Sequence, residues 1–168
     1  MKEHALVPLV REFAIPIATS LGLLLWGIRV IRAKTTIIQC FVDKEGGATI
    51  DDCTNFSRAL DAELDIVDEE QSIYSALHAL ESYTLEVSTP GIERCFFTLS
   101  QLKAYIGKKM SVVLGSPLSM LPNRRKFDGT LTAIENNTVH IDVAGLGIHC
   151  ECPWDSIERI QLIYFDKT

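Results

Sequence analysis

In the first half of the chain, apolar and polar residues alternate with two different periodicities, one typical of helices and the other of strands. Apolar residues recur at helical spacing over residues 3–20 and again from Cys53 to Leu64, which predicts two helices. Strict alternation predicts strands centred on residues 26–30, 38–42 and 83–87. A small sheet of this kind needs helices on one face to close a core. The pattern therefore predicts a two-layer α/β domain in the order α-β-β-α-β.

Turn and capping residues set the expected limits of these elements. Gly22 should end the first helix, and residues 33–35 should turn the first two strands into a hairpin. Thr49 with Asp52 three positions later predicts a capping box at the start of the second helix. The acidic segment Asp65–Gln71 predicts a loop, and Ser72–Leu80 predicts a further helical turn or two before the third strand.

The second half of the chain has the pattern of a small strand-rich domain. Thr98 and Gln101 predict a capped short helix, Leu99–Ile106, which Gly107 should end. Short alternating segments separated by tight turns then predict strands at Met110–Leu114, Phe127–Ile134, Thr138–Val143, Ile148–Cys152 and Ile160–Phe165. Such a meander favours a small SH3- or Sm-like β-barrel. The expected fold class is α+β, with an α/β domain over residues 1–90 and the barrel, led by its short helix, over residues 91–168.

A stiff elbow connects the two expected domains. The alternating strand Tyr83–Ser88 leads directly into Thr89-Pro90-Gly91, which predicts a type II turn. Proline fixes its own φ, and glycine supplies the positive φ that this turn requires. The elbow should therefore present Glu93 and Arg94 in a fixed direction.

Charge is distributed unevenly between the two halves. Apolar residues make up 47% of the chain and charged residues 23%, as in a folded globular protein, and the formal net charge is −6. This balance argues against a protein that coats nucleic acid by electrostatics alone. Residues 1–98 carry 8 basic and 15 acidic side chains, whereas residues 99–168 carry 8 basic and 7 acidic. The second half therefore offers the better surface for RNA, at the basic groups Lys103, Lys108 and Lys109 and Arg124, Arg125 and Lys126.

Cysteine usage and the apolar run near the N-terminus indicate a cytoplasmic protein. The 5 cysteines have no CxxC spacing, which argues against a disulfide framework and fits a reducing compartment. The apolar run Phe13–Ile28 is too short for a comfortable membrane span and is broken by Pro16 and Gly22. We therefore expect no membrane association.

Neither a metal centre nor a catalytic site is expected. His140, His149, Cys150 and Cys152 have side-chain types that suit zinc, but strand alternation places His149 on the opposite face from the two cysteines. Cys53 at a helix start has acidic neighbours that disfavour a thiolate. The acidic residues Asp43, Asp51 and Asp52 lack the ligand order of a calcium loop, and helix capping accounts for them. No nucleophile or phosphate-loop motif occurs, so we expect no cofactor and no enzyme.

Three segments in series resemble the bacterial ribosome maturation factor family RimP. Residues 85–94 (LEVSTPGIER) resemble that family's LEVSSPG motif, which continues with Leu or Ile, an acidic residue and Arg. Residues 41–49 (FVDKEGGAT), 51–53 (DDC) and 57–60 (SRAL) resemble its strand, loop and helix in the same order. The chain differs at Thr89, where the family most often has Ser, and at Cys95, where it usually has Pro.

The resemblance implies a non-catalytic assembly factor for the small (30S) ribosomal subunit, acting late in maturation. Its expected partners are precursors of that subunit, through ribosomal RNA and the small-subunit protein of the decoding region, and we expect a monomer. A stand-alone Sm-like RNA-binding regulator without ribosomal specificity is the alternative, which exposed aromatic residues for base stacking would favour. The resemblance and the basic groups together give the expected binding residues: Asp43, Asp51, Asp52, Arg58, Ser88, Pro90, Gly91, Glu93, Arg94, Lys108, Lys109, Arg124, Arg125 and Lys126.

Overall fold

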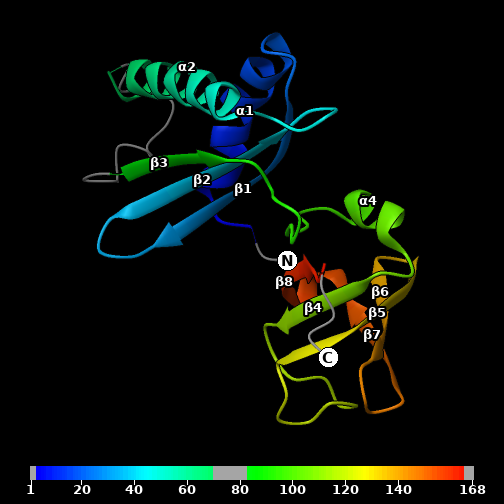
Figure 1. Ribbon diagram of the computed structural model, residues 1–168. Coiled ribbons are helices and arrows are strands. Elements are labelled where there is room, and N and C mark those ends of the chain that lie inside the picture. The colour runs from blue at the N-terminus through cyan, green and yellow to red at the C-terminus, as the bar shows by residue number, and fades with distance from the viewer. Residues whose placement is uncertain (1–2, 70–82, 165–168) are drawn as a thin grey trace. The chain divides into compact units, whose positions relative to one another are not determined.

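The computed structural model describes residues 3–69 and 83–164 (Figure 1). The chain forms two compact units, one of Glu3–Pro90 and the other beginning at Gly91. The fold class is mixed α+β, with a three-stranded sheet in the first unit and a five-stranded sheet in the second. None of the helices in the described residues is both long and apolar enough to cross a membrane.

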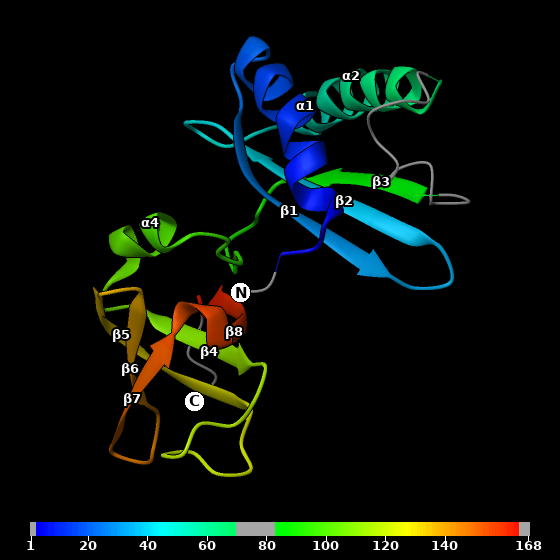
Figure 2. The same cartoon turned by 180° about the vertical axis from the view of Figure 1, so that it is seen from behind.

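The first unit is a two-layer structure with helices on one side of its sheet (Figures 1 and 2). Its elements run α1 (Leu6–Ser20), β1 (Leu24–Arg32), β2 (Thr36–Asp43), α2 (Ile50–Glu69) and β3 (Tyr83–Ser88). Strand β2 lies in the middle, antiparallel to β1 and parallel to β3. The predicted order α-β-β-α-β is confirmed.

The core of this unit lies between the sheet and the two helices. Strand alternation turns Ile38, Cys40 and Val42 of β2 inward, and all three are completely buried. The helices cover them with apolar stripes, which include Val10 and Ala14 of α1 and Phe56, Leu60 and Leu64 of α2. The capping box of α2 is also confirmed, because the Asp52 backbone N–H donates to Thr49 Oγ1 at 3.2 Å and the Thr49 N–H donates to the Asp52 carboxylate at 2.7 Å.

The predicted loop at Asp65–Gln71 is wrong over its first part, because α2 continues to Glu69. Leu60 and Leu64 anchor the preceding turns in the core, and no proline or glycine follows before Glu69. Once a helix is formed, each further residue adds one backbone hydrogen bond without a new nucleation cost, so the acidic residues do not stop it. The helical turns predicted for Ser72–Leu80 lie outside the described residues.

The second unit is an antiparallel sheet preceded by a short helix. Helix α4 (Leu99–Leu102) passes into the 3₁₀ turn η1 (Lys103–Tyr105), and the strands are β4 (Lys109–Leu114), β5 (Lys126–Glu135), β6 (Thr138–Val143), β7 (Ile148–Pro153) and β8 (Ile157–Leu162). The sheet order is β7-β6-β5-β4-β8, so the last strand pairs beside the first. A second 3₁₀ turn, η2 (Trp154–Ser156), connects the two edge strands.

The sheet is not closed into the predicted barrel within the described part of the chain. Its edge strands β7 and β8 do not pair with each other. The turn between them instead bonds to other segments, because the Trp154 N–H donates to the Asn137 carbonyl at 2.9 Å and the Ser156 carbonyl accepts from Gly115 N–H at 2.9 Å. These bonds keep the turn on the β5–β6 hairpin and on the end of β4.

Two predicted element boundaries in this unit are corrected. The Thr98–Gln101 capping box is present, but the α-helix ends at Leu102 and only the 3₁₀ turn follows, because Gly107 N–H and the Lys108 carbonyl are already bonded to Leu131 of β5. The last strand begins at Ile157 rather than Ile160 and ends at Leu162. Ile157 and Ile160 are both buried although they are three positions apart, and an irregularity in the β4–β8 register at Val113/Leu114 accommodates that spacing.

Candidate functional site

The elbow after β3 has the backbone conformation that its sequence predicts. Gly91 has a φ of +72°, in the left-handed region, and a Cβ built on it would meet no atom within 4 Å. Glycine is therefore required by the backbone and not by crowding. The Arg94 side chain closes the elbow, because its Nε donates to the Gly91 carbonyl at 3.2 Å.

The residues that leave the elbow are fastened to the edge strand β8. Gln161 Nε2 donates to the Glu93 carbonyl at 2.8 Å, and Cys95 forms an isolated antiparallel bridge with Gln161. The Leu162 N–H donates to the Arg94 carbonyl at 2.9 Å, and the Phe96 N–H donates to the Ile160 carbonyl at 3.0 Å. These bonds hold the segment in place.

A first groove lies in the α/β unit between the start of α2 and the end of β3. Its lining includes Arg58 from α2, Ser88 at the end of β3, and Thr89, which follows the strand. Arg58 is exposed and has no partner within the described residues. Ile50, 85% exposed, adds an apolar contact at the same groove. The structure therefore brings together Arg58 and Ser88, two of the predicted binding residues that are 30 positions apart in the sequence.

Asp52 stabilises the start of α2. The Lys44 ammonium lies 2.7 Å from the Asp52 carboxylate, which also accepts from Thr49. These hydrogen bonds, that of Lys44 first, lower the pKa of Asp52 from 3.8 to about 2. Asp43 accepts the Lys44 N–H at 3.0 Å, whereas Asp51 is exposed on the first turn. None of the three acidic residues lines the first groove.

A second groove runs across the outer face of β4, β5 and β8. Its lining includes Glu93 from the elbow exit, Lys109 and Ser111 from β4, and Lys126 and Asp128 from β5. Strand register explains the grouping, because Ser111 pairs with Asp128 on one side and with Gln161 on the other. Lys109 and Lys126, from basic groups 17 positions apart in the sequence, therefore lie in one groove.

The three basic residues Arg124–Lys126 differ in their contacts, because only the Arg125 side chain is bonded to the sheet within the described part of the chain. Arg125 Nε donates to the Leu114 carbonyl at 3.0 Å, and its Nη2 lies 3.3 Å from both carboxylate oxygens of Glu158. Arg125 is therefore held against β4 and β8. The side chains of Arg124 and Lys126 are exposed and have no partner among the described residues. Lys108 is exposed as well, but it does not line the second groove.

Four of the cysteines, Cys40, Cys53, Cys150 and Cys152, have thiol pKa values raised above the ordinary value. All 5 are free, and Cys40, Cys150 and Cys152 are completely buried. Burial raises the pKa of the Cys40 thiol to about 12 and raises the pKa values of Cys150 and Cys152 as well. Desolvation and then the nearby Asp52 carboxylate raise the pKa of Cys53. Thiols with raised pKa values are poor nucleophiles at neutral pH.

Gln161 was not singled out by the sequence patterns, and Lys44 appeared there only within residues 41–49, without a role of its own. The Gln161 side chain donates a hydrogen bond to the carbonyl of Glu93, 68 positions earlier in the sequence, and the Lys44 ammonium holds the Asp52 carboxylate at the start of α2. For Lys44 the signal was its place in residues 41–49, the segment that precedes the capping box. For Gln161 the signal was alternation in β8, which places it on the face opposite the buried Ile160.

Comparison with known proteins gives one consistent result. A family model described as the RimP N-terminal domain matches residues 13–93. Proteins named Ribosome maturation factor RimP from two strains of Nitratidesulfovibrio vulgaris, DP4 and Hildenborough, are each 39% identical over 170 residues, which covers 98% of this chain and 94% of theirs. The protein of the same name from Lawsonia intracellularis is 33% identical over 185 residues, covering 98% of this chain and 90% of its own.

Proposed function

Because the chain belongs to the ribosome maturation factor RimP family, we propose that it is a non-catalytic assembly factor that binds precursors of the small ribosomal subunit during late maturation. The observation that carries the proposal is the likeness to proteins of that name over 98% of this chain. The raised pKa values of the buried Cys40 and Cys152 thiols disfavour thiol catalysis and are consistent with a protein that acts by binding. The proposed location is the cytoplasm, with the protein acting as a monomer.

The first groove supplies directed contacts in this proposal. Arg58 offers a guanidinium fork that is not occupied within the described part of the chain, which suits a carboxylate or a phosphate. Ser88 offers a hydroxyl beside it, and Ile50 offers apolar area. The elbow residues Pro90, Gly91, Glu93 and Arg94 would add contacts whose direction the backbone fixes. The first groove by itself suits either proposed partner, ribosomal RNA or the small-subunit protein of the decoding region.

The second unit adds long-range attraction. Lys109 and Lys126 in the second groove, with Arg124 and Lys108 outside it, would attract phosphates or an acidic protein surface. The sheet order, with β8 beside β4, supports an SH3- or Sm-like docking module. Tyr164 is the one aromatic residue among the exposed large apolar side chains described in this unit, which gives little support to base stacking by a stand-alone RNA-binding protein.

Sedimentation of a cell lysate through a sucrose gradient tests the proposal. The protein should be found with free small subunits and their precursors, and not with 70S ribosomes or polysomes. Recovery only at the top of the gradient, at low and at moderate salt, would refute it. Recovery with RNA that is free of ribosomal particles would instead support the stand-alone RNA-binding regulator.

A paired substitution on α2 tests whether the first groove makes the contact. Arg58→Ala should reduce the fraction that sediments with small-subunit precursors, because it removes the groove's cation. Asn55→Ala is the matched control, since Asn55 is exposed on the same helix but does not line the groove. Equal co-sedimentation of the two variants, with unchanged circular dichroism, would remove the first groove from the interface.

A further inference from the structure

Two histidines and two carboxylates form a square on the outer face of the β6–β7 hairpin. In the register of these strands His140 lies opposite Glu151, and Asp142 lies opposite His149. Residues two apart on a strand share a face, so all four side chains project from the same side of the sheet. Cys150 and Cys152 alternate with them and are buried on the other side. The square is thus separate from both grooves and from the thiols.

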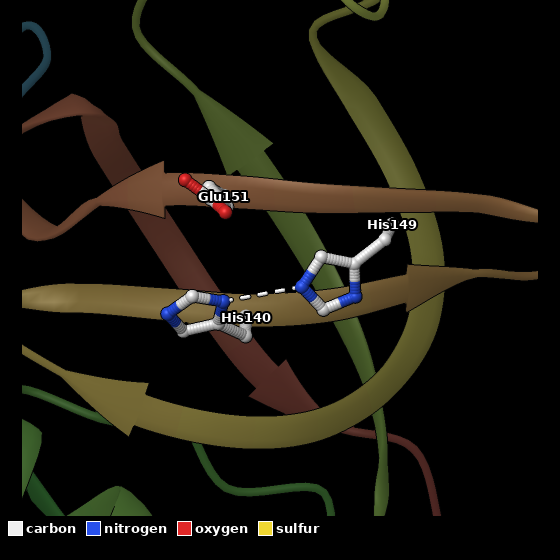
Figure 3. A group of neighbouring side chains, drawn as sticks. All are labelled: His140, His149 and Glu151. Carbon is white, nitrogen blue, oxygen red and sulfur yellow. Dashed lines mark hydrogen bonds between the residues drawn. The ribbon is translucent and has the colours of Figure 1, made fainter.

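The two histidine rings are already at a metal-chelating separation. His140 Nδ1 lies 3.1 Å from His149 Nε2, and Figure 3 shows the two nitrogens pointing toward each other. Two nitrogens bound to one tetrahedral zinc, each at about 2.0–2.1 Å, are about 3.3–3.4 Å apart. The separation therefore has to grow by only a few tenths of an ångström, and the two rings have to turn so that both lone pairs converge on the ion.

A third ligand is present on the same face. Glu151 projects from the strand that carries His149, and its carboxylate and the two ring nitrogens all lie within 4.8 Å of one another (Figure 3). The side chain of Glu151 is exposed and can rotate to shorten that distance. Two imidazoles and one carboxylate form a ligand set of three, which leaves the fourth tetrahedral position for water.

Asp142 orients one of the rings for this task. Its Oδ1 lies 2.7 Å from His149 Nδ1. An ionised carboxylate can only accept, so Nδ1 of His149 donates, and the neutral ring then carries its lone pair on Nε2, the atom that faces His140. Such a carboxylate–histidine pair fixes the tautomer and direction of metal-binding imidazoles.

From this geometry we infer that the β6–β7 hairpin binds one zinc ion, through His140 Nδ1, His149 Nε2 and the Glu151 carboxylate. Asp142 is the positioning residue. Before binding, the neutral His140 ring carries its proton on Nδ1 and donates it to His149 Nε2; on binding, the ring changes tautomer, so that Nε2 carries the proton and the Nδ1 lone pair binds the zinc. The site is at the surface, so the ion exchanges with solution, and the fold does not depend on it. This inference is independent of the proposed ribosomal role.

Calorimetric titration of the full-length, metal-free, reduced protein with zinc tests the inference. We expect one ion per chain. His140→Ala, His149→Ala and Glu151→Gln should each weaken binding by about ten-fold or more, since each removes a ligand. The matched controls are His4→Ala, a histidine of the other unit, and Glu135→Gln, an exposed carboxylate beyond the square; both should bind as the unchanged chain does. Absence of saturable binding, or binding that survives the combined His140→Ala and His149→Ala change, would overturn the inference.

Two spectroscopic readings separate this site from its alternatives. Cobalt added in place of zinc should give no thiolate charge-transfer absorption, and such absorption would mean that cysteines hold the metal and would overturn the assignment. Nitrogen NMR of the histidine rings should show the Nδ1–H tautomer at His149 in the metal-free chain. Asp142→Ala should remove that preference and weaken zinc binding by about 10–100-fold. Unchanged affinity and tautomer in this variant would refute the positioning role.

Discussion

Lys126, in the second groove, and Arg124, two positions earlier, should control the salt dependence of binding. Replacing Arg124 and Lys126 together by alanine removes two side chains that have no partner within the described chain. If each contacts one phosphate, the slope of log affinity against log salt should flatten by about 0.7–0.9 per contact, or about 1.4–1.8 in total. The variant's defect should therefore shrink about 7–12-fold when salt rises from about 50 to about 200 mM.

Arg125 provides the contrast within the same cluster. Its guanidinium is bonded to the Leu114 carbonyl and to Glu158, and both partners of the ion pair are about half exposed. Arg125→Ala should lower the free energy of unfolding by no more than about 1 kcal/mol. It should leave the salt slope unchanged, because this side chain is directed at its own sheet. Lys34→Ala, at the tip of the β1–β2 hairpin in the other unit, controls for the loss of charge.

The assay is the affinity for purified small-subunit precursors across a salt series, with circular dichroism to confirm folding. The reasoning is refuted if the double variant keeps the slope of the unchanged protein. It is also refuted if Arg125→Ala or Lys34→Ala flattens the slope as much as the double variant does.

Three further substitutions test single features of the structure. Gly91→Ala should cost about 1–2 kcal/mol of stability from backbone strain alone and should weaken precursor binding at every salt concentration, as urea unfolding and the same affinity assay will show. Gly129→Ala places a Cβ 2.4 Å from the Asp142 carbonyl oxygen and should cost at least about 1–3 kcal/mol, whereas Gly115→Ala, whose nearest atom is 3.6 Å away, should change the unfolding free energy by less than about 0.5 kcal/mol. Because the folded pKa of Asp52 is lowered to about 2, its carboxylate stabilises the fold above pH about 4 and loses that effect as pH falls toward 2. The stability difference between the unchanged chain and Asp52→Asn, measured by urea unfolding at several pH values, should therefore shrink over this interval and stay constant above it.

Local rules in the sequence determined most of the secondary structure. Alternation placed Ile38, Cys40 and Val42 on the buried face of one strand, and Thr49 with Asp52 marked the start of α2. The positive φ of Gly91 followed from the Pro-Gly pair. These features depend on neighbouring residues only, so a single sequence carries the information.

Element boundaries depended on contacts that local patterns do not contain. The end of α2 lies beyond the predicted one because Leu60 and Leu64 anchor it in a core formed with the sheet. The last strand begins earlier than its alternation suggests because a register irregularity beside β4 lets Ile157 reach the core. In both cases burial against distant strands outweighed the local preference.

The functional surfaces were only partly predictable for the same reason. The sequence identified Arg58, Ser88, Lys109 and Lys126 as candidates, but only strand order and register placed them in two grooves. It grouped Arg125 with Arg124 and Lys126, although Glu158, 33 residues away, holds Arg125 against the sheet. Which residues lie side by side depends on the arrangement of strands that buries the most apolar surface and satisfies the backbone hydrogen bonds. Because these free-energy contributions come from the entire unit, a local stretch of sequence does not determine them.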